Sequence, residues 1–182
     1  MSFAFVTTNK GKVKEAEGIL GQKLEVFSLD LDEIQSMDLE KIVRQKAIAA
    51  FEKVKKPLIV DDVSVEVAAW NGFPGPFVKF LVEAVGPAGA IQMMHGVNER
   101  RVVVKASVGL HDGKNVYTFV GEVSGVIAPS PRGSGGYGWD SIFIQDGQSK
   151  TYAEMTLEEK NAISHRHAAL EKVRAFLVTH PM

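Results

Sequence analysis

The segment Phe3–Leu20, FAFVTTNKGKVKEAEGIL, predicts a strand followed directly by a helix. Its first four residues form an apolar run of strand length. After the polar connection TTNKGK, apolar residues recur at the spacing of one helix face, at Val13, Ala16, Ile19 and Leu20. The chain therefore opens with a β–loop–α unit, whose loop ends where the free N–H groups of a helix begin.

The start of this helix carries positive charge at the unfavourable end. Lys10, Lys12 and Lys14 lie where the helix dipole is positive, and each such charge costs roughly 0.3–1 kcal/mol. A bound phosphate would turn this cost into an attraction, because backbone N–H groups and cations would converge on it. The segment thus predicts a phosphate site, with solvated surface lysines as the alternative.

A second helix start repeats the pattern near the C-terminus. In SHRHAAL, Ser164 is a suitable N-cap and is followed by His165 and Arg166, while Lys160 lies just upstream. Taken from the residues alone, these cations predict another anion contact.

The rest of the chain predicts a mixed α/β sheet. Strands alternate with helices in the first half, alternating apolar runs around HDGK predict a hairpin, and TLEEK has the form of a capping box. Further strands are expected at residues 24–29, 58–60, 63–69, 101–108, 116–123, 125–128 and 142–144, and helices at 12–20, 39–54, 164–179 and, as two short ones, before residue 95. Since repeats and linkers are absent from the sequence, we expect a single α/β domain over residues 1–182.

Composition excludes several functions. The 182 residues include 21 Lys and Arg against 22 Asp and Glu, so the net charge of −1 argues against general binding to nucleic acid or anionic membranes. The absence of cysteine excludes disulfides, thiol catalysis and thiolate metal sites. No apolar run reaches membrane-spanning length, and the opening run is too short for a signal peptide. We therefore expect a soluble cytoplasmic protein that binds neither nucleic acid nor membrane.

Two acidic motifs predict a metal site. LIVDD places Asp61 and Asp62 at the end of a strand, and because successive strand residues face opposite ways we expect only one of them to enter a site. DLDEIQ supplies Glu33 in a loop, and Lys46 lies on the apolar face of an expected helix, where it either reaches the rim or points into a polar site. Carboxylates without Cys or paired His suit Mg²⁺ held together with substrate phosphates, although a solvated acidic loop is the alternative for Glu33.

The glycine-rich motif GSGGYGWD places Tyr137 and Trp139 in a flexible loop that ends at Asp140. An aromatic ring there is either a core anchor or a platform on which a nucleobase stacks. Lysines, carboxylates and aromatic rings together predict a site for Mg²⁺ and a nucleoside polyphosphate. TTNKGK is not a Walker A loop, because its glycine spacing differs and Val13 stands where Ser or Thr would bind the metal.

The order and spacing of six motifs resemble the inosine triphosphate pyrophosphatase family: TTNKGKVKE, LDLDEIQ, IVRQKA, VDD with GFPGPFVKF, GYGWD and TYAEMTLEEKNAISHR. The resemblance covers nearly the whole chain, and GFPGPFVKF is closer to archaeal and eukaryotic members. It implies an elongated, two-lobed α/β fold around a long mixed sheet, a homodimer and a requirement for Mg²⁺. It also implies hydrolysis of ITP, dITP or XTP to the monophosphate and pyrophosphate, which keeps deaminated purines out of nucleic acid.

The resemblance also assigns roles to individual residues. For the phosphates, the family pattern matches Thr7, Thr8, Asn9, Lys12 and Lys46. For Mg²⁺ it matches Glu33 and Asp62, and Asp62 is also the base that activates the attacking water. For the purine it matches Tyr137, which stacks, together with Gly138, Trp139, Asp140, Lys160, His165 and Arg166. The last three residues recognise the base in the family, whereas their charges alone suggested phosphate, and we follow the family.

Three positions depart from the usual family pattern. Thr8 replaces Gly or Ser, Val63 replaces Ser or Thr, and Ser141 replaces Pro. None of these changes removes a candidate catalytic group, so we expect activity.

Three other functions remain as alternatives. A related pyrophosphatase that prefers modified pyrimidines would share the architecture. A non-catalytic nucleotide-binding module would bind ITP without turnover, but the retained Asp62 and Glu33 argue against it. An RNA-binding protein is the weakest alternative, because the charge is balanced.

Overall fold

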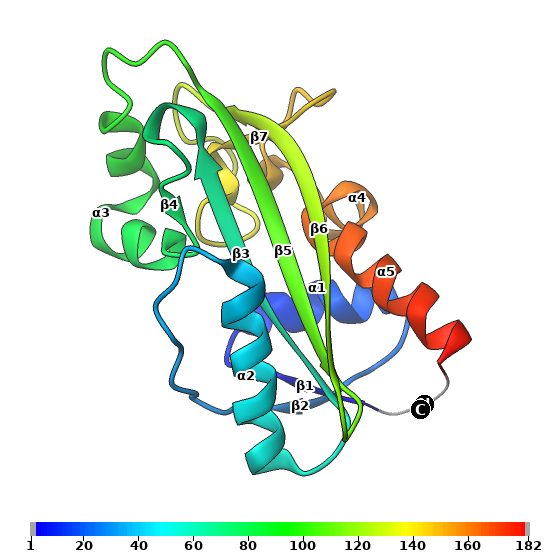
Figure 1. The fold of residues 1–182 in the computed structure, drawn as a ribbon. Coiled ribbons are helices and arrows are strands. Elements are labelled where there is room, and N and C mark those ends of the chain that lie inside the picture. The colour runs from blue at the N-terminus through cyan, green and yellow to red at the C-terminus, as the bar shows by residue number, and fades with distance from the viewer. Residues whose placement is uncertain (1–2, 181–182) are drawn as a thin grey trace.

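The computed structural model describes residues 3–180 and contains a mixed sheet with helices on both faces (Figure 1). Its strands are β1 (Ala4–Val6), β2 (Glu25–Phe27), β3 (Leu58–Val67), β4 (Pro74–Gly75), β5 (Arg101–His111), β6 (Val116–Ile127) and β7 (Phe143–Gln145). Its helices are α1 (Lys10–Leu20), α2 (Leu39–Val54), α3 (Val78–Gln92), α4 (Leu157–Ile163) and α5 (His165–Thr179), with 3₁₀ turns η1 (Ala68–Trp70), η2 (Asp140–Ile142) and η3 (Tyr152–Glu154). The seven-stranded sheet has the order β2-β1-β3-β5-β6-β7, and β4 pairs with β3 beside this path. The predicted α/β class is confirmed.

The sheet is parallel at one side and antiparallel elsewhere. β1 lies parallel to both β2 and β3, because helical connections return the chain to the same end of the sheet. From β3 through β5 and β6 to β7, neighbouring strands run antiparallel. The predicted HDGK hairpin joins β5 to β6, and in it the Asp112 carboxylate accepts the N–H groups of Lys114 and Asn115, both at 2.7 Å.

Helices bury the two faces of the sheet in separate apolar clusters. On one face α2 packs residues such as Val43 against Val60 of β3. On the other face α1 and α5 join a larger cluster that continues to α3. Gly121 of β6 lets α5 lie directly on the sheet, because a Cβ at this position would be 2.2 Å from backbone atoms of α5. The first turn of α5 is thereby held against β6.

The two helices that carry cations at their starts, α1 and α5, each begin with a side-chain cap. Asn9 caps α1 by accepting two backbone N–H groups at 2.8 and 3.2 Å, and the helix begins at Lys10, two residues earlier than predicted. Ser164 caps α5 by accepting the backbone N–H of His167 at 3.2 Å. The predicted bounds of α2 and the predicted capping box of TLEEK are confirmed.

Strand β3 runs unbroken where the sequence predicted two strands, and that prediction is wrong. All ten of its residues pair with β5, so Asp61 and Asp62 lie in the middle of a strand and not at its end. β1 pairs with β3 only as far as Ile59, and β4 pairs with it only from Val65 onward. One edge of β3 is therefore uncovered by strands beside the two aspartates.

Two further elements differ in continuity. β6 is also a single strand where two were expected, since its pairing with β5 and then β7 continues through Gly125. α3 is interrupted at Gly86, whose φ is 68°, just before Pro87, and this agrees with the two short helices predicted there. Within residues 3–180, no helix combines the length and apolar composition that crossing a membrane requires.

His111, at the end of β5, makes the stability of this fold depend on pH. Its ring stacks on Phe51 of α2 with centroids 3.9 Å apart, and its Nδ1 accepts the N–H of Gly113 at 3.0 Å. Burial lowers the pKa of His111 below its usual value of about 6.5, against a smaller opposing effect of the Asp112 charge. Folding therefore favours the neutral form of this ring.

We expect the free energy of unfolding to fall as the pH drops below about 6.5, because the unfolded chain then binds a proton at His111 that the folded chain does not. The variant His111→Phe keeps the stacking and removes this proton, so it should lose less stability between pH 7 and pH 5.5. Urea denaturation at a series of pH values measures both slopes. Equal slopes for the two proteins would contradict the assignment.

Candidate active site

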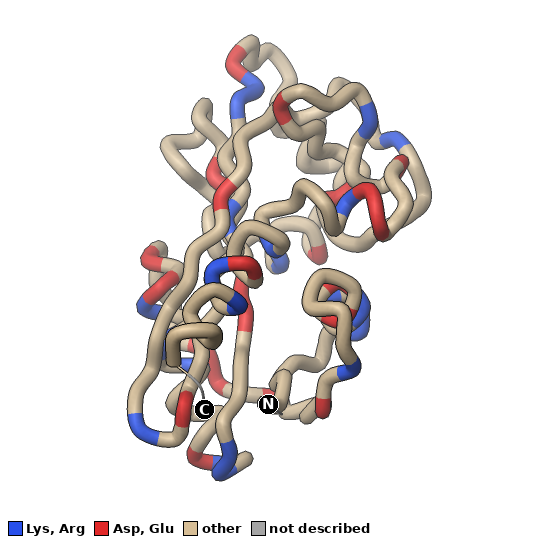
Figure 2. Tube along the Cα trace, turned by 90° about the vertical axis from the view of Figure 1, so that its right-hand side faces the viewer, with Lys and Arg blue, Asp and Glu red and all other residues tan. Residues whose placement is uncertain are grey.

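A pocket of about 360 Å³ opens beside the uncovered edge of β3. Its walls come from the first turn of α1, from β3, from the start of α3, from the loop before η2, and from α4 and the start of α5. Among the residues predicted from sequence, it is lined by Asn9, Lys12, Asp62, Tyr137, Gly138, Trp139, Asp140, Lys160, His165 and Arg166. Acidic and basic positions are interspersed along the trace in Figure 2. The pocket brings together side chains of both charges from segments that are distant in sequence.

The remaining predicted residues lie around this pocket. The Thr7 hydroxyl accepts the N–H of Asn9 at 3.1 Å and so shapes the loop before α1, whereas Thr8 is exposed. Glu33, on the loop between β2 and α2, and Lys46, on α2, form an ion pair with 2.5 Å between Oε1 and Nζ. Lys46 Nζ also lies 3.7 Å from Asp62 Oδ2, so the pair adjoins the pocket wall.

The uncovered edge of β3 explains how two lysines come together. The carbonyl oxygen of Asp61 accepts hydrogen bonds from Nζ of Lys12, at 3.2 Å, and of Lys46, at 3.4 Å. In a continuous sheet, an N–H group of a neighbouring strand would donate to this carbonyl, since buried carbonyl groups need a hydrogen-bond donor. Lys12 Nζ is also 3.1 Å from Asp61 Oδ1 and 3.9 Å from Asp62 Oδ1. Two ammonium groups and two carboxylates therefore meet at this point.

Asp61 and Asp62 point to different surroundings. Asp61 is 3% exposed and binds Nε of Arg166 at 2.9 Å. Burial alone would raise the pKa of Asp61, but the charges of Lys12 and Arg166 outweigh burial and hold that pKa well below its usual range. The Asp62 side chain is 20% exposed, lines the pocket, and accepts the N–H of Val63 at 2.8 Å. Asp62 is thus the carboxylate of the pair that faces the pocket.

A buried ion cluster forms a second end of the pocket and shares Asp61 with the first, since Asp61 Oδ1 pairs with Lys12 and Asp61 Oδ2 pairs with Arg166. Glu15 of α1 binds Lys160 Nζ at 2.8 Å and also pairs with Arg166 Nη1. Asp140 binds Lys160 Nζ at 2.6 Å, and Asp61 holds Arg166. All five side chains are at most 4% exposed. Lys160, in the last turn of α4, and Arg166, at the start of α5, were suggested for phosphate by the residues alone, but both are balanced by carboxylates within the protein.

Hydrogen-bond donors remain free at this end. Among the residues that the structure describes, Nη2 of Arg166 and both ring nitrogens of His165 are buried without a hydrogen-bond partner, and both residues line the pocket. Burial, reinforced by the charges of Arg166 and Lys160, lowers the pKa of His165 well below its usual value, so its ring is neutral. Arg166 can only donate hydrogen bonds. An acceptor on a ligand would satisfy its buried Nη2.

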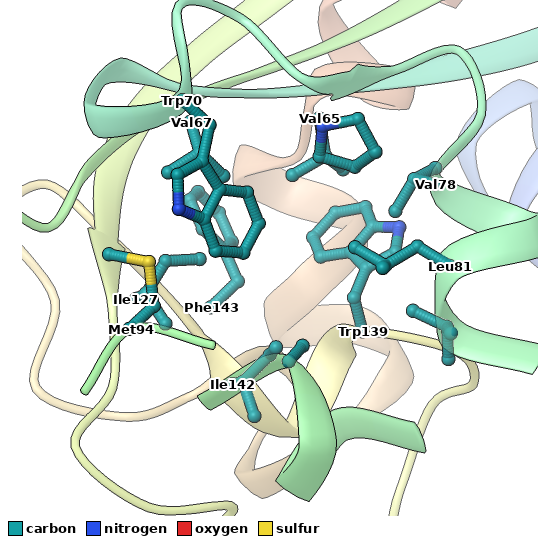
Figure 3. Close-up of a pocket in the computed structure, with 13 residues that line it drawn as sticks. Val65, Val67, Trp70, Val78, Leu81, Met94, Ile127, Trp139, Ile142 and Phe143 are labelled. Atoms are coloured by element: carbon teal, nitrogen blue, oxygen red, sulfur yellow. The ribbon is translucent and has the colours of Figure 1, made fainter. Parts of the chain in front are cut away.

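Two aromatic side chains complete this end of the pocket. The Tyr137 ring lies against Gly11 of α1, where a Cβ would be 2.6 Å from the ring, and its hydroxyl accepts from Arg166 Nη1 at 3.1 Å. Trp139 separates the pocket from a small apolar cavity of about 20 Å³, and its ring lies near Val78 and Leu81 in Figure 3. Trp139 is therefore both a core anchor and a wall of the pocket, and its stacking on a nucleobase stays a prediction.

Sequence reasoning missed two residues of this site. Glu15 connects Lys160 to Arg166, and the available signal was its position one helical turn from Lys12 and from Ile19, on the buried side of α1. Lys79 lines the pocket near the start of α3 and is 75% exposed. No periodicity distinguished Lys79 from an ordinary surface lysine.

The acidic groups set limits on any metal site. Over residues 3–180, no group of three or more His, Cys, Asp or Glu side chains is arranged to hold a metal ion. Glu33 and Asp62 nevertheless share one cation, the Lys46 ammonium. Two carboxylates of this kind suit a hard cation that takes its other ligands from water and from a bound phosphate.

Lysines and carboxylates at one end of the pocket, and free donors beside aromatic rings at the other, define an α/β protein whose cleft suits a polyanion attached to a ring. The chain belongs to the Ham1 family, whose model matches residues 3–176. The inosine triphosphate pyrophosphatase of Schizosaccharomyces pombe is 41% identical over 180 residues, which cover 97% of this chain and 95% of that protein. The dITP/XTP pyrophosphatase of Thermococcus kodakarensis is 39% identical, with 97% of each chain covered. The structure of the Staphylococcus aureus Ham1 protein matches with a TM-score of 0.82 at 27% identity and covers 97% of this chain and 99% of its own. The predicted family resemblance is confirmed.

Replacing Glu15 by Gln should destabilise the protein strongly. The substitution keeps the shape but removes a buried charge that balances Lys160 and Arg166, and breaking a buried pair costs about 3–5 kcal/mol. Lys14→Gln, at the adjacent exposed position, should change the free energy of unfolding by less than about 0.5 kcal/mol. Denaturant unfolding of both variants makes the comparison. Equal small effects would show that the cluster contributes little.

Proposed function

We propose that this protein hydrolyses non-standard purine nucleoside triphosphates, namely ITP, dITP and XTP, to the monophosphate and pyrophosphate. The observation that carries the proposal is Arg166, which lines the same pocket as Lys12 and Asp62 and whose buried Nη2 has no hydrogen-bond partner among the described residues. The names of the relatives, inosine triphosphate pyrophosphatase and dITP/XTP pyrophosphatase, support the same activity. The enzyme would remove deaminated purines from the nucleotide pool.

The phosphate end of the pocket supplies charge and a base. Lys12, Lys46 and the loop Thr7–Asn9, which leads into the start of α1, would bind the triphosphate. Glu33 and Asp62 would hold Mg²⁺ together with phosphate oxygens, and their shared contact with the Lys46 ammonium supports this fit. When bound, the ion neutralises phosphate charge. We expect the reaction to depend on a metal ion, and we propose that this ion is Mg²⁺.

The chemistry is an in-line attack of water at the α-phosphorus. Asp62 faces the pocket and takes the proton of the water as the new phosphorus–oxygen bond forms. The bond between the α-phosphorus and the oxygen that bridges to the β-phosphorus breaks, and pyrophosphate leaves with that oxygen. Lys12 and Lys46 stabilise the negative charge of the leaving group.

The base end of the pocket selects the purine. Tyr137 would stack on the ring, and the segment Gly138–Asp140 would close around it. Arg166, with Lys160 and His165 beside it, would donate to the 6-oxo group of hypoxanthine or xanthine. Adenine carries an amino donor at this position, and a site built on such hydrogen bonds can discriminate by about 10⁴.

The assembly and location follow from the same proposal. We propose that residues 1–182 form one domain with two lobes, and the apolar cluster that continues from α1 and α5 to α3 supports a single unit. We also propose a homodimer, supported by the exposed apolar side chains of Met37, Phe73 and Phe80. The substrate pool places the enzyme in the cytoplasm.

Incubation with ITP and Mg²⁺ should give IMP and pyrophosphate in equal amounts, because the lysines bind the two outer phosphates as one leaving group. Chromatography of the nucleotides together with an assay for pyrophosphate measures both products. IDP with orthophosphate would exclude attack at the α-phosphorus. ATP should be a far poorer substrate than ITP. A preference for modified pyrimidine triphosphates would instead support the related pyrophosphatase. Binding of ITP without turnover would support a non-catalytic binding module.

The two adjacent aspartates should separate by phenotype. Asp62→Asn removes the base and should lower kcat by about 10²-fold or more while leaving the fold intact. Asp61→Asn removes the charge of a carboxylate that pairs with Lys12 and is one of the two that balance buried Arg166, so it should mainly lower the free energy of unfolding, by about 3–5 kcal/mol. Steady-state kinetics and denaturant unfolding of both variants test this. Comparable losses of kcat without destabilisation at both positions would refute the choice of carboxylate.

A further inference from the structure

The ammonium of Lys46 lies among oxygen atoms that would suit a divalent cation. Its Nζ is 2.5 Å from Glu33 Oε1, 3.7 Å from Asp62 Oδ2 and 3.4 Å from the carbonyl oxygen of Asp61. The side chain is 13% exposed, so this position is largely withdrawn from water. Two carboxylates and a carbonyl are the ligands that hard cations take in proteins. The lysine and a metal ion would therefore compete for the same oxygens.

We propose that Lys46 is a placeholder cation, which occupies the place between Glu33 and Asp62 in the nucleotide-free enzyme and keeps free Mg²⁺ out until a triphosphate draws the ammonium away. The inference rests on the proposed function, because it assumes that the triphosphate and the ion share this site. It adds a second role for Lys46, before any phosphate is bound. It also fixes an order, in which the metal enters with the nucleotide and not ahead of it.

Charge balance supports the exchange. Without a ligand, Glu33 and Asp62 are neutralised in part by Lys46, whose pKa is raised because these carboxylates outweigh the opposite effect of burial. A divalent ion placed beside the ammonium would meet a like charge at close range. With triphosphate present, phosphate oxygens offer the ammonium a new partner and the carboxylates become free for the ion.

The side chains involved have the freedom that the exchange needs. Lysine is a compact charge on a flexible four-carbon stem, so its head can move without a shift of α2. Glu33 is 44% exposed on the loop between β2 and α2. Arg166 is 2% exposed and held by both Glu15 and Asp61, so it does not take part in the exchange.

The test is titration of the nucleotide-free protein with Mn²⁺ alone, followed by the electron paramagnetic resonance signal of the free ion. Lys46→Met keeps the length of the side chain without its charge and should bind Mn²⁺ at least about tenfold more tightly than the wild type. The repulsion energy between two like charges at this distance exceeds the binding free energy that a tenfold change in affinity requires. Lys46→Arg keeps the charge and should remain weak. Lys12→Met is the matched control, because Lys12 lies 3.9 Å from Asp62 but forms no ion pair with Glu33 in the described structure. It should change the affinity far less.

The outcomes are separable from the proposed function. If Lys46→Met, shown by circular dichroism to be folded, binds Mn²⁺ no more tightly than the wild type, the placeholder role is wrong even where the wild type releases pyrophosphate from ITP. If Lys46→Met and Lys12→Met tighten binding equally, general electrostatics accounts for the effect and the inference also fails. A gain that Glu33→Gln abolishes in the Lys46→Met background supports it. Absence of ITP turnover by the wild type would refute the proposed function separately, because the Mn²⁺ titration contains no nucleotide.

Discussion

Burial of the Arg166 guanidinium is the constraint on which the rest of the structure depends. A charge removed from water is costly unless partners balance it, and Arg166 is only 2% exposed. Its carboxylate partners are Asp61 on β3 and Glu15 on α1, each more than 100 residues away in the chain. Glu15 also binds Lys160 of α4, so one set of charges fixes α1, β3, α4 and α5 relative to one another. The pocket exists because these elements cannot separate without exposing a charge to water or leaving a buried charge without its partner.

The uncovered edge of β3 is the second condition for the site. Since β1 ends its pairing at Ile59, the carbonyl of Asp61 has no strand beside it and takes lysine donors from α1 and α2 instead. Lysines from opposite faces of the sheet thereby meet at one point. A continuous strand partner would satisfy the carbonyl and leave no room for them. The site is thus a consequence of unequal strand lengths within one sheet.

Local signals in the sequence were sufficient for much of the fold. The apolar period of α2, the HDGK turn and the capping box of TLEEK depend on residues a few positions apart, and they were predicted correctly. The continuity of β3 could not be predicted, because two adjacent carboxylates are typical of a strand end and only pairing with β5 carries the chain through them. Glu15 was missed for a related reason. Its spacing from Ile19 indicates the buried side of α1, but its partners Lys160 and Arg166 lie on distant segments, so nothing near it in sequence shows that its charge is balanced.

The two ends of the pocket hold their cations in different ways, and the difference fits the two tasks of the proposed reaction. Arg166 and Lys160 are almost fully buried and tied to carboxylates, so neither can move to accommodate a ligand that lacks a suitable acceptor. Discrimination between a carbonyl and an amino group requires this rigidity, because the penalty arises only if the unmatched donor stays unpaired. Lys12 and Lys46 are 13% exposed and share one carboxylate, that of Asp62. They can follow charge as it moves onto the leaving group. In the proposed reaction, the fixed cations would therefore serve selection of the base, and the mobile ones would serve cleavage of the phosphoric anhydride bond.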